Sequence, residues 1–323
     1  MTRKLFSVVL SAFALLLLMG AAAVPEQSAA LVAEEESAVL DETALETEAD
    51  ASADELEELL EDAAPAAPSE NPLELAELGD PSLLIDGQPA AQDVGKTQSG
   101  GITYVALAPM AQTLNSAAQV SWDGSTAAIT APGLELTAQV GRQYVVANGR
   151  YLYLPEGVQV MNGRVTVPLW AVAESFGAQV GWDGNTGTVT VIRGSAPIQN
   201  GDSYYNQDDL FWLSRIIVAE SGNQPLEGQM AVGNVVMNRV ASPIYPNSVQ
   251  EVLAQKNQFS PYKSGALAER TPDEEAIIAA KLVLDGGVVP ETDGALYFDS
   301  TSRSWAAKNR PYIATIGNHN FYG

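Results

Sequence analysis

The pattern of apolar and polar positions divides the chain into segments of different kinds. A run of apolar residues extends from Leu5 to Met19, and a polar, acidic stretch with scattered leucines then continues to about residue 80. From Ser82 to Arg193, short apolar segments alternate with glycine-rich turns, a pattern typical of strands and hairpins. From Asp208 onward, apolar residues recur at helical spacing. The sequence therefore predicts a small α+β domain followed by a domain that begins with helices.

The α+β region contains one visible repeat. The stretch Tyr104 to Thr130 (YVALAPMAQTLNSAAQVSWDGSTAAIT) is echoed by Thr166 to Thr190 (TVPLWAVAESFGAQVGWDGNTGTVT), so that two Trp-Asp-Gly sequences lie 60 positions apart. Each copy predicts a strand, a helix and a hairpin whose turn begins at the Asp-Gly pair. Between the copies, Leu134 to Leu154 predicts further strands with a turn at Asn148-Gly149.

The residues of the two Trp-Asp-Gly turns admit a functional interpretation and a structural one. Asp123 and Asp183 are acids, but an aspartate at the first position of a turn commonly accepts hydrogen bonds from the backbone that follows it. Trp122 and Trp182 are either platforms for sugar rings or core residues. We interpret the acids as turn caps and the tryptophans as core residues.

Two helices are predicted at the start of the C-terminal region, over DDLFWLSRIIVAESGN (Asp208 to Asn223) and PLEGQMAVGNVVMNRV (Pro225 to Val240). Glu220 stands in the last turn of the first helix, where the helix dipole and apolar neighbours both disfavour a charged carboxylate and raise its pKa. A carboxyl that holds its proton near neutral pH is what a glycosidase general acid requires. From residue chemistry alone, a surface glutamate at a helix end remains the alternative.

The second predicted helix carries polar residues within an apolar surrounding. Gln229 and Asn238 are either buried and hydrogen-bonded to the structure or directed into a cleft. Gly228 and Gly233 allow another backbone to approach the helix closely.

The first residues indicate export. Arg3 and Lys4 precede the apolar run, and small residues follow it from Gly20 to Ala23, as in a secretory signal peptide. The alternative is an uncleaved membrane anchor. In either case the rest of the chain is expected outside the cytoplasm.

Charge and composition exclude several classes of function. The net charge of −24 is concentrated between Glu26 and Asp80, which contain 19 acidic residues and no Lys or Arg. Like charges with few large apolar groups predict a disordered spacer. A chain so poor in basic residues is not expected to bind nucleic acid. It has no cysteine and one histidine, His319, so no disulfide, metal site of several imidazoles or cofactor is expected.

The predicted organisation therefore has five parts. They are a signal segment (1–23), an acidic spacer (24–80), an α+β domain (81–194, called the repeat domain below), a linker (195–206) and a C-terminal domain (207–323).

The repeat domain resembles the copper amine oxidase N-terminal-like domain, a small α+β module of many exported bacterial proteins. The resemblance rests on the repeated pattern that ends in Ala-Gln-Val, Trp, Asp and Gly, and it covers about 110 residues. In that family the module is a stalk. Copper chemistry is not implied here, because the chain lacks the histidines of a copper site.

The C-terminal domain resembles the SleB-type cell-wall hydrolase family, best known from spore-cortex-lytic enzymes. Four motifs occur in order: AESGNQPLEGQMAVGNVVMNRV (Ala219 to Val240), NQFSPY (Asn257 to Tyr262), ALYFDS (Ala295 to Ser300) and IGNHNFYG (Ile316 to Gly323). The resemblance implies a multidomain α+β protein in which a mainly helical, lysozyme-like catalytic domain follows the repeat domain.

The resemblance also implies the reaction and its principal residue. The family cuts the β-1,4 bond between N-acetylmuramic acid and N-acetylglucosamine, and its essential glutamate matches Glu220. This acid would protonate the leaving oxygen and then act as the base for the attacking group. If the muramic acid 6-hydroxyl attacks, the enzyme is a lytic transglycosylase, which the family favours. If water attacks, it is a muramidase.

The chain departs from the commonest family pattern, which has Gly and Glu where Asn223 and Gln224 stand here. Gln224 removes the nearest candidate for a second carboxylate. Glu227 remains, but an acid is expected in the first turn of a helix for dipole reasons alone.

Further residues of the motifs are candidates for contacts with the acetamido groups and ring faces of a glycan. They are Gln229, Asn238, Gln258, Phe259, Ser260, Tyr297, His319 and Tyr322. Phe259 and Phe321 are alternatively core residues, His319 a structural histidine, and Lys308 to Arg310 a solvated basic turn.

The expected function is that of a secreted, wall-associated enzyme whose partner is the peptidoglycan glycan strand, with membrane contact only through an uncleaved signal segment. A non-catalytic wall-binding protein is the rival from another class. An amine oxidase is excluded by the single histidine.

Overall fold

The computed structural model describes residues 83–256 and 258–323, which belong to one compact unit. The expected signal segment and acidic spacer lie outside these residues and stay predictions. Within the described part of the chain, no helix is long and apolar enough to span a bilayer.

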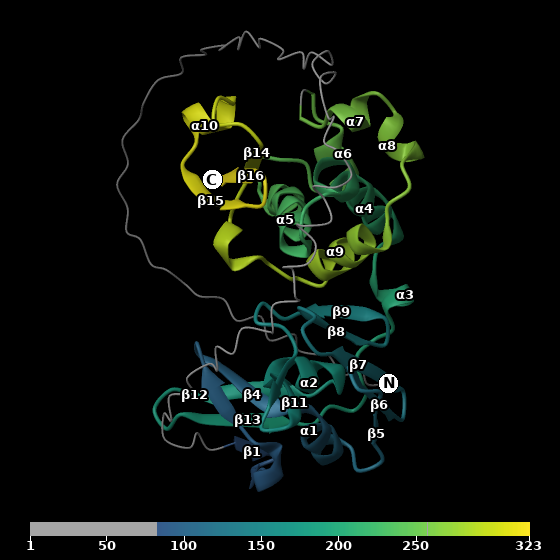
Figure 1. Cartoon of the computed structure of the whole chain (residues 1–323), viewed down its shortest axis with the longest axis vertical. Helices are drawn as coiled ribbons and strands as arrows, with labels where there is room; N and C mark the ends of the chain where they lie inside the picture. Colours follow the sequence, from purple (N-terminus) through teal and green to yellow (C-terminus); the bar gives the residue numbers. More distant parts are fainter. Residues whose placement is uncertain (1–82, 257) are drawn as a thin grey trace, which may run out of the picture. The chain divides into compact units, whose positions relative to one another are not determined.

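The two sequence repeats fold in the same way, as the strand, helix and hairpin pattern predicts (Figure 1). The first copy consists of β4 (Ile102–Ala106), α1 (Leu107–Leu114), β5 (Gln119–Trp122) and β6 (Thr126–Ala131). The second consists of β11 (Arg164–Pro168), α2 (Leu169–Ser175), β12 (Gln179–Asp183) and β13 (Thr188–Ile192). The first strands of the two copies, β4 and β11, pair antiparallel, so the repeats are joined through one sheet.

Further short elements complete the repeat domain. They are β1 (Leu83–Ile85), β2 (Gln88–Pro89), the 3₁₀ turn η1 (Gln92–Val94), β3 (Thr97–Ser99), β7 (Leu134–Gln139), β8 (Tyr144–Ala147), β9 (Arg150–Tyr153) and β10 (Gln159–Met161). The predicted turn at Asn148-Gly149 joins β8 to β9, and both residues have positive φ (50° and 77°), as a tight hairpin turn requires.

Three sheets enclose the core of the repeat domain. Their strand orders are β12-β13-β1-β2, β10-β11-β4-β3 and β5-β6-β7-β8-β9. Both repeat hairpins therefore place their first strand, β5 or β12, at the edge of a sheet. The core includes Leu107 and Met110 of α1 together with Leu169 and Val172 of α2, which pack between the sheets.

The tryptophans of the repeat do not belong to this core, which corrects the expectation from sequence. Trp122 is 51% exposed and Trp182 is 69% exposed. The physical reason is the edge position, because β5 and β12 each have one neighbouring strand and every residue of both strands is exposed. The two aspartates fulfil the expected role, since Asp123 Oδ1 accepts from the amides of Ser125 and Thr126, and Asp183 Oδ1 from that of Asn185.

The segment expected as a linker is ordered. It contains the short helix α3 (Gly201–Tyr204), and Ile198 is buried in the core of the repeat domain. Asn148 Nδ2 donates to the carbonyl oxygens of Gly133 and Ile198, so the β8–β9 turn holds this segment in place.

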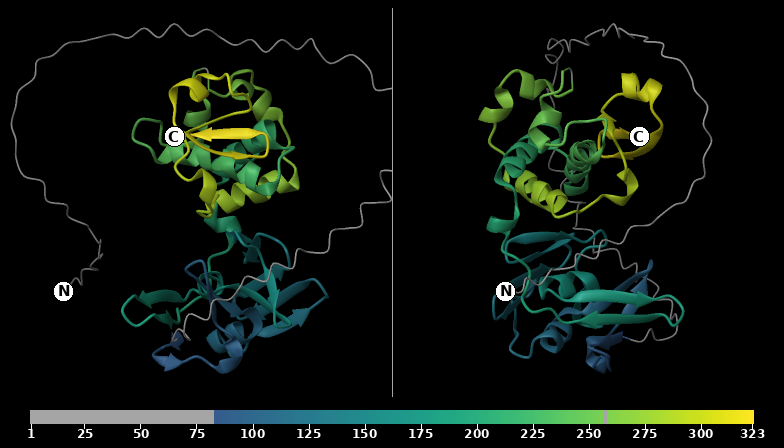
Figure 2. Two further views of the ribbon diagram at one scale, coloured as in Figure 1. Left: turned by 60° about the vertical axis from the view of Figure 1, so that its left-hand side comes forward. Right: turned by 180° about the vertical axis from the view of Figure 1, so that it is seen from behind.

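The C-terminal domain combines helices with one small sheet (Figure 2). Its helices are α4 (Gln207–Ser221), α5 (Leu226–Ala241), α6 (Val249–Leu253), α7 (Ser260–Lys263), α8 (Ala266–Glu269), α9 (Glu274–Leu284), η2 (Pro290–Thr292) and α10 (Trp305–Asn309). The sheet has the order β14-β16-β15, from β14 (Tyr297–Asp299), β15 (Tyr312–Ile316) and β16 (His319–Tyr322).

Helix α5 is the centre of this domain, because it contacts α4, α6, α9 and the sheet strands β14 and β15 (Figures 1 and 2). Residues 228 to 236 of α5 are all buried. Gly233 permits this packing, since a Cβ there would lie 3.0 Å from Ile217 Cδ1 of α4 and 3.2 Å from Val283 Cγ2 of α9. The close approach expected at this glycine is therefore present.

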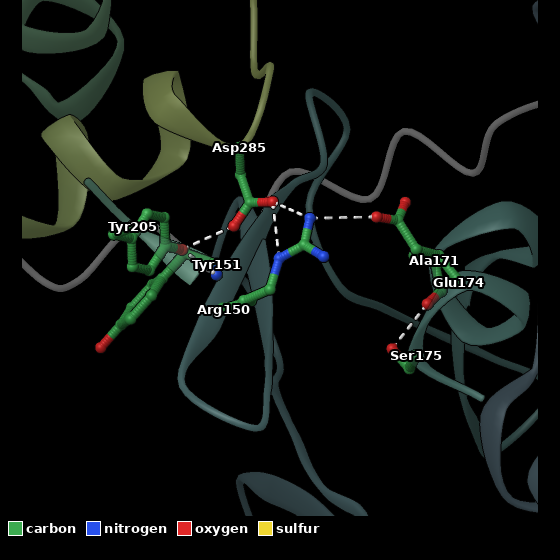
Figure 3. A network of polar contacts seen from close by, with 7 residues as sticks. All are labelled: Arg150, Tyr151, Ala171, Glu174, Ser175, Tyr205 and Asp285. Atoms are coloured by element: carbon green, nitrogen blue, oxygen red, sulfur yellow. Dashed lines mark hydrogen bonds and ion pairs between the residues drawn. The ribbon is translucent and has the colours of Figure 1, made fainter. Parts of the chain in front are cut away.

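A set of polar contacts joins the repeat domain to the C-terminal domain (Figure 3). Arg150 of β9 forms an ion pair with Asp285, which follows α9, and its Nε lies 2.9 Å from Asp285 Oδ1. The Asp285 side chain is 1% exposed. Tyr205 donates from its hydroxyl to Asp285 Oδ2 over 2.5 Å, and Glu174 of α2 lies 3.3 Å from the same guanidinium. We call these four residues the Arg150 seam.

Candidate functional site

Glu220 lies in the last turn of α4, where the sequence placed it. The helix begins after Asn206, whose Oδ1 accepts hydrogen bonds from the amides of Asp208 and Asp209 at 2.9 and 3.1 Å. It ends at Ser221, and Gly222 follows with right-handed φ and ψ (−61° and −16°) rather than the left-handed values common at helix ends. The cap at one end and the turn at the other fix the position of Glu220 along the helix.

The surroundings of Glu220 favour its protonated form. The side chain is half-buried, and burial raises the pKa of its carboxyl above the ordinary value, while the nearby positive charge of Arg270 partly opposes this shift. Among the residues that the structure describes, none donates a hydrogen bond to this carboxylate, so its protonation does not break an internal interaction. This carboxyl can therefore retain a proton and give it to a substrate.

The turn after Glu220 is fixed by Gln224. Its Oε1 accepts from the amide of Asn318 at 2.8 Å, which ties the turn to the one between β15 and β16. Gln229 is fully buried and donates from Nε2 to the carbonyl oxygen of Gln224 at 3.1 Å. Gln224 thus has a structural role. The contact of Gln229 favours the interpretation that this side chain is buried and hydrogen-bonded to the structure rather than directed into a cleft.

A second group of candidates gathers around Arg239 of α5. Its Nη1 donates to Gln258 Oε1 at 2.9 Å, and its guanidinium lies 5.4 Å from the ring centre of Phe259 and 5.3 Å from that of Tyr297. Asn238, the preceding residue, donates from Nδ2 to the carbonyl oxygen of Ala295, just before β14. Residues 238 and 239 of α5 therefore hold the segment that carries Tyr297.

Trp305 and Arg310 extend this group to the surface, and sequence reasoning did not single out Trp305. Trp305 is exposed, and the centre of its ring lies 5.8 Å from the centre of the Tyr297 ring. The Arg310 guanidinium lies 4.9 Å from the centre of the Tyr297 ring. The signal available in the sequence was a single tryptophan among polar and basic residues between the third motif, ALYFDS, and the fourth, IGNHNFYG. We call Tyr297, Trp305 and Arg310 the aromatic–arginine surface.

The remaining candidates lie mostly inside the domain. His319 is buried, and the centre of its ring lies 5.4 Å from the centre of the Phe298 ring. Burial lowers the pKa of its imidazole. Tyr322 is buried and pairs with Tyr297 across β14 and β16. Phe259 and Phe321 are core residues, as their structural interpretation expected. Ser260 is exposed at the start of α7.

The structure therefore brings Gln258, Phe259 and Tyr297 together around Arg239, with Tyr322 on the adjacent strand. Glu220 shares no hydrogen bond or ion pair with this group within the described ranges. A cavity of ≈ 330 Å³ borders the Arg150 seam, and Glu220 is not among the residues that line it.

Comparison with known families assigns both domains. Residues 223–322 match the family described as cell wall hydrolase, and residues 84–191 match the copper amine oxidase N-terminal domain. The chain thus carries a cell wall hydrolase domain at its C-terminus, preceded by a copper amine oxidase N-terminal domain. Glu220 lies just before the first matched residue of the hydrolase domain.

Curated relatives and a solved structure are similar to parts of this chain. A spore cortex-lytic enzyme of Oceanobacillus iheyensis is 31% identical over 145 residues, which are 44% of this chain and 50% of the relative. That of Bacillus cereus is 35% identical over 121 residues, 36% of this chain and 45% of the relative. The chain thus spans about half the length of these relatives. The catalytic domain of a germination-specific lytic transglycosylase, SleB of Bacillus anthracis, is similar at 34% identity, with 39% of this chain and 100% of that chain covered and a TM-score of 0.34.

Proposed function

We propose that this protein cleaves the β-1,4 bond between N-acetylmuramic acid and N-acetylglucosamine in peptidoglycan, as a lytic transglycosylase with Glu220 as its single acid and base. The observation that carries the proposal is the half-buried carboxyl of Glu220, whose pKa is raised by burial and which lies just before the stretch that matches the cell wall hydrolase family. The C-terminal domain is, in this proposal, a mainly helical lysozyme-like catalytic domain acting outside the cytoplasm.

In the first half of the reaction, Glu220 donates its proton to the oxygen of the scissile glycosidic bond. The bond to the muramic acid C1 breaks, the N-acetylglucosamine leaves as an alcohol, and an oxocarbenium-like centre develops. The carboxylate then accepts the proton of the muramic acid 6-hydroxyl as that oxygen bonds to C1. The product carries a 1,6-anhydro bridge, and Glu220 is protonated again.

The contacts of Glu227 support a mechanism with one acid. Glu227 is the nearest later carboxylate, but its Oε1 accepts hydrogen bonds from Gln143 Nε2 at 2.7 Å and from the Tyr153 hydroxyl at 3.1 Å. Both donors belong to the repeat domain. A carboxylate engaged in this way is not available to activate a water molecule opposite Glu220.

The aromatic–arginine surface is the proposed binding region for the glycan. An exposed tryptophan ring beside a tyrosine offers flat apolar area for the C–H face of a sugar, and Arg310 offers charge-assisted hydrogen bonds to carboxylates of the peptide stems. Gln258, Ser260, His319 and Tyr322 stay candidates for contacts with acetamido groups. Asn238 and Gln229 act, in this proposal, by positioning the neighbouring segments.

The decisive experiment compares Glu220→Gln with Glu227→Gln on purified peptidoglycan. Glu220→Gln is expected to lower the release of muropeptides by at least about 100-fold, the usual contribution of general acid–base catalysis. Glu227→Gln makes the same substitution at the carboxylate of the next helix and is expected to retain the chemistry. Retained activity in Glu220→Gln would refute the proposal.

Mass analysis of the products distinguishes the two possible attacking groups. Transglycosylation gives anhydro ends that are lighter by one water than the reducing ends from hydrolysis. Reducing ends alone would make the enzyme a muramidase. Binding to wall sacculi without any cleavage would instead identify a non-catalytic wall-binding protein.

A further inference from the structure

The two repeat hairpins display a tryptophan at the same place, and neither ring serves the core. Trp122 is the last residue of β5 and Trp182 the second-last residue of β12, each directly before the Asp of the turn. They are paired with Ala127 and Val189 on the next strand. The repetition means that one arrangement of an exposed aromatic ring on a sheet edge occurs twice in one domain.

Both tryptophans stay more than half exposed, although the Trp182 ring lies against Gly184 of its own turn, where an added Cβ would be 3.2 Å from the ring. Each turn is held by its aspartate, which accepts hydrogen bonds from the backbone amides that follow. A large apolar side chain that is left mostly exposed forgoes the stabilisation that its burial would contribute. Val120 and Val180 are also exposed on these two strands, so each strand displays a valine and a tryptophan. Exposed apolar side chains that lie together mark interaction sites.

The residues beside the rings indicate the chemistry of the partner. Along each strand, the tryptophan shares a face with Val120 or Val180, and the polar side chains of Gln119, Ser121 and Gln179 lie on the other face of the same edge. The two strands carry no basic residue, and the acids at the turns, Asp123 and Asp183, accept hydrogen bonds from the turn amides. An exposed aromatic ring at an edge without free charges fits the C–H face of a neutral sugar.

A repeated surface fits a repeated ligand. The hairpins of β5–β6 and β12–β13 project from different sides of the repeat domain in Figure 1, so one small ligand does not reach both. A polymer of identical sugars offers binding positions to each of them. Two weak sites on one chain then act together, because the first contact raises the effective concentration for the second.

We propose that Trp122 and Trp182 are two contact points through which the repeat domain holds the N-acetylated glycan strands of the cell wall. The choice of this glycan rests on the proposed function of the C-terminal domain. The repeat domain is then a binding module that keeps the enzyme on its insoluble substrate rather than a passive stalk.

The test measures sedimentation of the full chain with purified sacculi stripped of proteins and anionic polymers. Every variant also carries Glu220→Gln, so that the sacculi stay intact. Trp122→Ala and Trp182→Ala are each expected to weaken binding, and the double variant by on the order of 100-fold because both contacts are lost. Trp→Phe at each position is expected to preserve most of the binding. Ile192→Ala is the matched control, since this side chain is 58% exposed on β13.

Two results would overturn the proposal. One is unchanged sedimentation of the double alanine variant. The other is a self-associated wild-type chain that the double variant renders monomeric in sedimentation equilibrium, because the rings would then bind a second copy of the protein.

A second measurement separates this inference from the proposed function. With Glu220 intact, the double tryptophan variant is expected to cleave soluble glycan fragments at the wild-type rate and intact sacculi more slowly. Equal rates on both substrates would contradict the proposal. If Glu220→Gln still cleaved, the proposed catalytic role would fail, and sedimentation measured before the sacculi are degraded would decide whether the tryptophans bind glycan.

Discussion

At the scale of single residues, the environment of Glu220 predicts how activity depends on pH. A general acid acts only when protonated, so activity falls as pH rises through its pKa. Burial raises that pKa, and the descending limb of kcat/KM should lie above the pH at which an ordinary glutamate titrates. The positive charge of Arg270 opposes this shift, so Arg270→Gln is expected to move the limb to higher pH.

The measurement is a pH profile of kcat/KM on soluble glycan fragments. Arg303→Gln is the control, because Arg303 is an exposed arginine that does not act on the pKa of Glu220. A limb that stays in place, or moves to lower pH, in Arg270→Gln would contradict the assignment of Glu220 as the acid.

At the scale of elements, the cap of α4 should matter for stability. Asn206 satisfies two backbone amides at the beginning of the helix that ends with Glu220. Asn206→Ala is expected to lower the free energy of unfolding by about 1 kcal/mol, whereas Asn206→Asp keeps an accepting oxygen and should cost little. Urea unfolding of the three proteins checks this, and equal stability of the alanine and aspartate variants would count against a capping role.

The sequence predicted the features that are set by residues close together in the chain, and it missed those that depend on contacts between distant segments. The strand, helix and hairpin of each repeat follow from periodicity and from the Asp-Gly turn, and so does the place of Glu220 in the last turn of α4. Its catalytic role, which stays a prediction, came from the family resemblance and not from the spacing. The exposure of Trp122 and Trp182 depends on strand order in the sheet, which joins segments far apart in sequence. The Arg239 cluster was equally out of reach, because its contacts span 19 and 57 positions.

At the scale of the whole molecule, the Arg150 seam should contribute strongly to stability. Arg150→Met would leave the carboxylate of Asp285 buried without its partner, at an expected cost of about 3–5 kcal/mol in the free energy of unfolding. Arg193→Met is the control, because the Arg193–Asp86 pair is about 40% exposed on both sides, and solvent weakens such pairs relative to buried ones.

Chemical denaturation of the full chain provides the comparison. The double variant Arg150→Met, Asp285→Leu is expected to recover part of the lost stability, since it removes the unpaired charge together with its partner. If Arg150→Met and Arg193→Met lowered the free energy of unfolding by the same amount, the seam would contribute no more to stability than an exposed ion pair, and the prediction would be wrong.

The seam also limits how such a chain can be recombined with others. Asp285 and Glu227 belong to the C-terminal domain, but the groups that satisfy them, Arg150, Tyr153 and Gln143, belong to the repeat domain. A C-terminal domain transplanted onto a foreign module would present two acids without donors. We therefore expect a chimaera of this kind to need substitutions at Asp285 and Glu227, or donors on the new module that replace the lost ones.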